Sequence, residues 1–80
     1  MEILVAREEL NSKPKKTTFE KLEQILSKKG EEIFYFDRDN SHKTMIELDD
    51  KFQSKGYNTH LREVKYGLAD EEYIYEMHIL

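Results

Sequence analysis

The residues best suited to chemistry are Asp37, Asp39 and His42, in the stretch EEIFYFDRDNSHKTM. Four apolar or aromatic residues lead into this polar cluster, as when a strand ends in an active-site loop. Two carboxylates with one residue between them can bind Mg²⁺, and a histidine one turn further on can transfer protons. A calcium loop requires glycine at its sixth position and glutamate at its twelfth. Counting from Asp37, these positions hold His42 and Leu48, so that motif is absent.

The same cluster has a simpler structural interpretation. Asp39, Asn40 and Ser41 are residue types that begin helices, because their side chains accept hydrogen bonds from free backbone amides and acidic groups complement the helix dipole. A cap needs no ligand, so we favour it and predict no catalytic residue and no metal ligand here. The pattern leaves open whether Asp37, Asp39 and His42 do more than cap a helix.

Other catalytic arrangements find little support in the sequence. The chain has no cysteine, which excludes disulfides, thiolate metal sites and a cysteine nucleophile. His60 and His78 fall on predicted strands without the third and fourth ligands that a zinc site requires. The glycines match helix ends and a turn, and no glycine-rich phosphate loop is present. We therefore expect a protein that is not an enzyme and that uses no cofactor.

Length and charge limit the remaining possibilities. A chain of 80 residues is long enough for one small core, so we expect a single domain spanning residues 1–80. The net charge of −4 disfavours nucleic acid as a partner. No apolar run approaches the ~20 residues that cross a bilayer, so we expect no membrane partner and a cytoplasmic location.

The first half of the chain predicts a strand, a loop and a helix. Residues 3–6 form a short apolar run typical of a strand, and Pro14 indicates a loop after it. Thr17 and Glu20 match a capping box, so a helix is expected from there to about residue 29, before Gly30. Its predicted inward residues recur at helical spacing. They are Phe19, Leu22, Ile25 and Leu26.

The second half repeats this pattern and then ends in a hairpin. A strand is expected over residues 32–37, and a helix from near Ser41 that stops at Gly56 and turns Met45, Leu48 and Phe52 inward. Two further strands, at about residues 58–66 and 73–80, are joined by a loop of about six residues.

The resulting order, β-α-β-α-β-β, predicts an α+β fold, specifically a two-layer α/β sandwich. Right-handed β-α-β units place both helices on one face of a mixed four-stranded sheet with strand order 1-2-4-3. This layout resembles that of the C-terminal domain of bacterial translation initiation factor three, of TusA/SirA-like sulfur carriers and of Alba-type chromatin proteins. The resemblance is one of topology, and the cysteine through which the sulfur carriers act has no counterpart in the segment SKPKK.

A sandwich of this kind leaves one sheet face without helices, and binding is expected there. On the last strand, Ile74 and His78 alternate with an apolar row suited to the core. The strand over residues 32–37 turns either Phe34 and Phe36 or Ile33 and Tyr35 to the same face, so the face is predicted to be partly apolar in either case. We therefore expect a small regulatory module that acts through protein–protein contacts or as a homodimer.

Nucleic acid is the alternative ligand. Tyr35, His60, Arg62 and His78 could stack on bases or contact phosphates from the open face. Lys13, Lys15 and Lys16 are expected at the entrance to the first helix, where free amides could also bind phosphate. The acidic net charge argues against this alternative.

Overall fold

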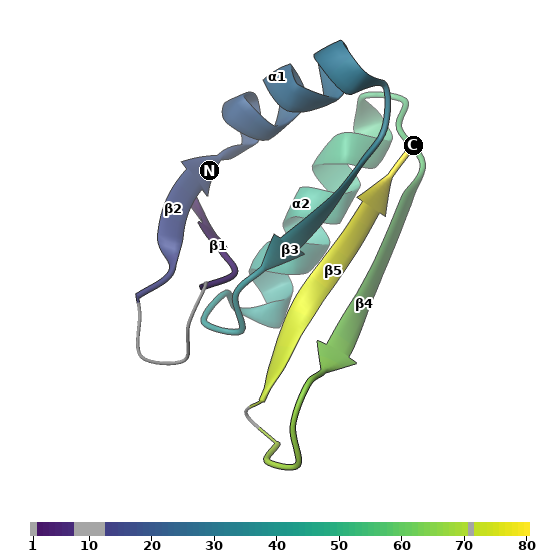
Figure 1. Ribbon diagram of the computed structural model, residues 1–80. Helices are drawn as coiled ribbons and strands as arrows, with labels where there is room; N and C mark the ends of the chain where they lie inside the picture. Colours follow the sequence, from purple (N-terminus) through teal and green to yellow (C-terminus); the bar gives the residue numbers. More distant parts are fainter. Residues whose placement is uncertain (1, 8–12, 71) are drawn as a thin grey trace.

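The computed structural model describes residues 2–7, 13–70 and 72–80. Within these residues, two helices and five strands follow one another in the order β-β-α-β-α-β-β (Figure 1). They are β1 (Glu2–Val5), β2 (Lys15–Thr18), α1 (Phe19–Lys29), β3 (Glu32–Phe36), α2 (His42–Ser54), β4 (Thr59–Lys65) and β5 (Tyr73–Ile79).

The described strands form one sheet with the order β2-β1-β3-β5-β4, in which neighbouring strands are antiparallel. The α+β class predicted from the sequence holds, and the four predicted strands lie in the predicted order 1-2-4-3, which here is β1-β3-β5-β4. The prediction is wrong in making the sheet mixed and four-stranded. A fifth strand, β2, lies at the edge beside β1. Because β2 reverses the chain before α1 begins, β1 runs antiparallel to β3, where the prediction made the first two strands parallel.

The extra strand has the sequence KKTT, for which the sequence pattern predicts a loop and a helix cap. Its register with β1 places Thr17 opposite Ile3 and Lys16 opposite Leu4. Threonine is a good strand former, and lysine on an edge strand discourages pairing with other chains. Residues 8–12, which belong to the predicted loop, lie outside the described residues.

Both helices begin at hydroxyl caps. The Thr18 hydroxyl accepts a hydrogen bond from the Lys21 amide, one residue later than the predicted capping box at Thr17, because β2 continues through Thr18 and α1 begins at Phe19. The Ser41 hydroxyl accepts from the Thr44 amide, which confirms the predicted start of the second helix. Gly30, with φ of 81°, adopts the left-handed conformation that ends α1.

The core lies between the helices and one face of the sheet. The inward residues predicted for α2 are fully buried, as are three of the four predicted for α1, but Ile25 is 39% exposed. Buried side chains from both layers form one cluster. It comprises Ile3, Phe19, Leu22, Leu26, Phe36, Met45, Leu48, Phe52, Tyr75, Met77 and Ile79.

Aromatic contacts join the two helices. The Phe19 and Phe52 ring centroids lie 4.8 Å apart, and Lys51 places its ammonium 4.8 Å from the Phe19 ring centre.

Neither helix has the length and apolar character needed to cross a membrane, within the residues that the structure describes.

The position of β5 between β3 and β4 leads to a stability prediction. Deleting residues 77–80 removes Met77 and Ile79, both fully buried, from the central strand. Losing each such side chain costs roughly 2–4 kcal/mol. Since a small domain has a total stability near the low end of ~5–15 kcal/mol, the truncated protein should be largely unfolded. Circular dichroism melts should show this, and a cooperative melt within a few degrees of the full-length protein would contradict it.

Candidate functional site on the open sheet face

The residues predicted for the open face share one side of the sheet. In the pairing of β4 with β5, His60 lies opposite His78 and Arg62 opposite Glu76. In the pairing of β3 with β5, Tyr35 also lies opposite Glu76. Directly opposed side chains point to the same side of an antiparallel sheet. Three strands therefore bring Tyr35, His60, Arg62 and His78 together on the face away from the core, with Ile74 further along β5.

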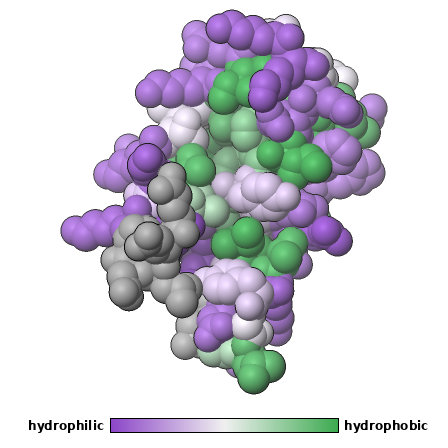
Figure 2. All heavy atoms as spheres, viewed as in Figure 1, coloured by the Kyte–Doolittle hydropathy of each residue, from purple (hydrophilic) through white to green (hydrophobic). Residues whose placement is uncertain are grey.

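Part of this face is apolar. Ile33 and Tyr35 on β3 are 42% and 45% exposed, and Ile74 and Val64 oppose each other, half-buried, on β5 and β4. Figure 1 views the sheet with α2 behind it, and Figure 2 shows the same side in space-filling form, with hydrophobic residues through its middle and hydrophilic residues around them. We call Ile33, Tyr35, Val64 and Ile74 the apolar strip.

The charged groups beside the apolar strip are largely paired. The Arg62 guanidinium donates to Glu76 through its Nε at 2.8 Å, and this contact raises the pKa of Arg62. The His78 Nε2 lies 3.7 Å from a carboxylate oxygen of Glu31. The two histidine rings, of His60 and His78, have centroids 6.4 Å apart. Arg62 and Glu76 therefore neutralise each other beside the apolar strip.

Next to the apolar strip, the sheet is open between β1 and β3. The two strands share a single residue pair, Val5 with Phe36. A cleft of about 500 Å³ lies beside this pair, with almost wholly apolar walls. It is lined by Val5, Ala6, Arg7, Leu22, Ile33, Phe34, Tyr35, Phe36 and Ile74. Sequence reasoning missed this cleft because its walls come from the loss of strand pairing, which no local pattern signals.

The predicted lysines lie elsewhere. Lys13, Lys15 and Lys16 are exposed, and the last two belong to the edge strand β2, where the sequence predicted a loop at the helix entrance. Lys16 forms an ion pair with Glu2 at 3.3 Å. β1 and β3 separate this edge from β5, so the lysines do not join the cluster around Arg62.

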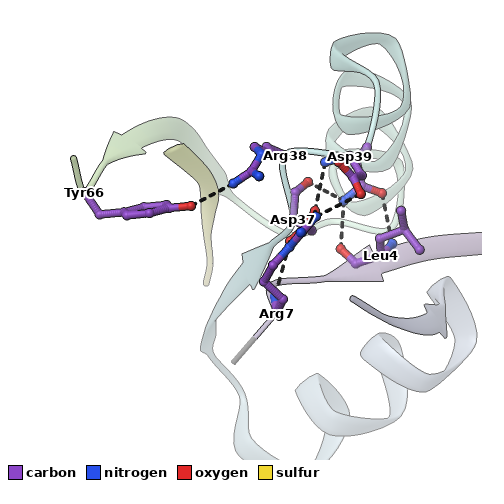
Figure 3. Close-up of polar contacts among 7 residues, drawn as sticks. Leu4, Arg7, Asp37, Arg38, Asp39 and Tyr66 are labelled. Carbon is purple, nitrogen blue, oxygen red and sulfur yellow. Dashed lines mark hydrogen bonds and ion pairs between the residues drawn. The ribbon is translucent and has the colours of Figure 1, made fainter. Parts of the chain in front are cut away.

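The Asp37 cluster is organised by Arg7, a residue that sequence reasoning did not select. The Arg7 Nε donates to one carboxylate oxygen of Asp37 and its Nη2 donates to the other, each at 2.8 Å (Figure 3). The same Nη2 also donates to Asp39 at 2.9 Å. Asp37 is 1% exposed. Its hydrogen bonds from the Arg7 side chain lower the pKa of Asp37 to about 2, so the buried carboxylate stays charged.

Asn40 continues this cluster toward β1. Its amide donates to the Leu4 carbonyl at 2.7 Å, and its side-chain oxygen accepts from the Leu4 amide at 2.9 Å. The side chain thus pairs with β1 as a strand residue would. The predicted capping role is therefore correct for Ser41 and wrong for Asp39 and Asn40, which hold Arg7 and Leu4. No group of three potential ligands suited to a metal occurs among the described residues.

His42 belongs to a different part of the surface. It lines a cleft of about 490 Å³ between α2 and β4, together with Asp49 and Tyr75. The His42 and Tyr75 ring centroids are 6.3 Å apart, and burial raises the pKa of Tyr75 to about 12, so its phenol stays protonated. Asp49 accepts from Gln53 through Oδ2, whereas its buried Oδ1 has no partner among the described residues. These three side chains are the titratable groups to test for any catalysis.

Comparison with known proteins gives one match. The model of the family described as HP0268 matches residues 1–80, so the chain belongs to that family. No curated protein and no solved structure matches it.

The Arg7–Asp37 contact predicts a specific dependence of stability on pH. Because the pKa of Asp37 falls from 3.8 to about 2 on folding, its contribution is complete above pH 4 and is lost as the pH falls toward 2. The difference corresponds to about 2 kcal/mol. Asp37→Asn should lose about that much at pH 7 and should lack this component of the acid dependence.

Urea unfolding between pH 7 and pH 3 measures both effects. Asp50→Asn, which removes an exposed carboxylate from α2, is the matched control and should follow the parent protein. Equal stability of Asp37→Asn and the parent at pH 7 would rule out the structural role assigned to this ion pair.

Proposed function

We propose that this member of the HP0268 family is a small, non-catalytic binding module that contacts a protein partner through its open sheet face. The observation that carries the proposal is the apolar strip of Ile33, Tyr35, Val64 and Ile74, which no described element covers. Contiguous exposed apolar residues on a small domain are typical of interaction sites.

The composition of the face supports a protein as the partner. Interfaces place apolar and aromatic residues at their centre and polar residues at their border, and tyrosine is frequent among the residues that dominate binding. Here Tyr35 lies beside Ile33 and Ile74, whereas Arg62 and Glu76 pair with each other next to them. The proposed location is the cytoplasm, a reducing compartment in which a chain without cysteine loses no disulfide.

A substitution within the strip tests this proposal. Ile74→Glu places a charge in the middle of the strip and should weaken association with a partner at least about tenfold, because a buried unpaired charge costs several kcal/mol. Ile25→Glu, at an exposed isoleucine on α1, is the matched control and should bind normally. The measurement is quantitative capture of the partner that co-purifies from the native cell. Equal capture by all three proteins would remove the face from consideration.

Self-association through the same face is a second form of this proposal. Sedimentation equilibrium at increasing concentration should then show a dimer for the parent and for Ile25→Glu, and a monomer for Ile74→Glu. A strict monomer for the parent at high concentration would exclude the homodimer and leave a different protein as the partner.

Single-stranded nucleic acid is the second candidate ligand. The observation that favours it is the cluster of Tyr35, Arg62, His60 and His78 on neighbouring strands, since aromatic and cationic groups on an open sheet can stack on bases. The Arg62–Glu76 ion pair opposes it, because the guanidinium is already neutralised.

Fluorescence titration with labelled mixed-sequence RNA and DNA separates the candidates. Nucleic-acid binding should weaken steeply with salt and should fall in Tyr35→Ala and Arg62→Ala. No binding at low salt would exclude this candidate. Conversion of the oligonucleotide to shorter products that is lost in His42→Ala would contradict the non-catalytic part of the proposal and would place a reaction in the cleft of His42, Asp49 and Tyr75.

A further inference from the structure

The inference begins where β1 leaves β3. The Ala6 amide donates to the Tyr35 carbonyl, and the Asp37 amide donates to the Leu4 carbonyl, each at 3.0 Å. A continued ladder would next bring Arg7 alongside Phe34. Instead, the Arg7 amide and side chain both bind Asp37, which follows the last residue of β3. This contact ends the pairing of β1 with β3 at Ala6.

Beyond that point, backbone groups on the edge of β3 have no partner among the described residues. Alternate residues of a central strand direct their backbone groups to the same neighbour, and those of Ile33 and Tyr35 face β1. The Ile33 amide binds the Glu32 side chain at 3.1 Å. Among the described residues, nothing donates to the Ile33 carbonyl and nothing accepts from the Tyr35 amide. Such groups are available to an added strand.

The cleft beside this edge has walls from both faces of the sheet. Leu22 and Phe34 approach it from the core side, and Ile33, Tyr35 and Ile74 approach it from the open side. Phe34 remains partly exposed, whereas Phe36, two residues along the same face and opposite Val5, is fully buried. In a strand that paired with β3 here, the residue opposite Phe34 would point its side chain toward the core and cover Phe34. The residues before and after it would cover Ile33 and Tyr35.

We propose that the cleft between β1 and β3 binds an extended segment of a partner protein, with three consecutive apolar residues, as an added strand beside β3. The central side chain enters between Leu22 and Phe34, and the flanking side chains lie against Ile33 and Tyr35. The segment accepts a hydrogen bond from the Tyr35 amide and donates one to the Ile33 carbonyl. This inference rests on the proposed function and specifies the partner for the same face.

The occupant is a different protein, not a second copy of this chain. The two edge strands that a second copy could offer are β2, with the sequence KKTT, and β4, with the sequence THLREVK. Neither contains three consecutive apolar residues, and their charged side chains would enter an apolar cleft. β5 is paired on both sides. β1 and β3 are each fully paired on one side only, and their other edges are the two walls of this same cleft.

The test uses the peptide acetyl-Lys-Thr-Val-Leu-Val-Thr-Lys-amide and the intact 80-residue protein. Amide NMR titration should shift the signals of Ile33 and Tyr35, and hydrogen exchange at the Tyr35 amide should slow at least about tenfold at saturation. A peptide with serine in place of the central leucine should bind about tenfold more weakly. Binding of both peptides alike would overturn the proposed insertion of the central side chain.

A protein variant provides the second arm. Ala6→Trp fills the cleft and should weaken the peptide about tenfold, whereas the matched Ala69→Trp, in the β4–β5 hairpin, should leave it unchanged. If Ala6→Trp melts less cooperatively than the parent, the comparison of the two peptides on the parent protein decides alone. Absence of peptide binding overturns this inference. If the peptide does not bind but Ile74→Glu still abolishes capture of the native partner, the proposed function stands without the added-strand inference.

Discussion

The contact between Arg7 and Asp37 determines how the N-terminal strand joins the rest of the protein. The residues lie 30 positions apart, and their two hydrogen bonds of 2.8 Å connect the end of β1 to the end of β3. A carboxylate as buried as Asp37 is stable only with a charged partner and complete hydrogen bonding. Arg7 supplies the charge, and the Asp39 amide donates a further hydrogen bond at 3.0 Å. Placement of β1 therefore depends on satisfying a single buried carboxylate.

This contact has two consequences for β1, both on the side that faces β3. Asn40, held next to Asp37, pairs with Leu4 through both of its side-chain groups and so fixes the register of β1. At the same time, Arg7 turns to Asp37 and cannot pair with β3. The interaction that attaches β1 to the sheet thus also limits its pairing with β3 and leaves the apolar cleft beside Ile33 and Tyr35.

The sequence predicts local structure well where the pattern is periodic. Phe19, Leu22 and Leu26 identify the buried side of α1, and Ser41 identifies the start of α2. It fails where partners are distant or polar. The segment KKTT has no apolar periodicity, and it forms a strand because β1 offers its free edge. Arg7 could be suspected only because it closely follows an apolar strand, and its partner Asp37 follows another. The spacing of Asp37 and Asp39 suggested metal or cap, since sequence alone cannot show that a cation from β1 reaches both.

Pairing of opposite charges also determines the character of the open sheet face. The net charge of −4 describes the whole chain, but on this face Arg62 is bound to Glu76 and His78 lies near Glu31. The pairing of Arg62 with Glu76 leaves little local field to select a highly charged ligand, so the binding that we propose for this face would depend on shape and apolar contact. The exposed Ile33 and Tyr35 provide that contact. A partner that covers this apolar surface gains free energy by removing it from water. A partner that binds the charged groups instead must first break their ion pairs. A protein segment can do the first, whereas the phosphate backbone of a nucleic acid would have to do the second.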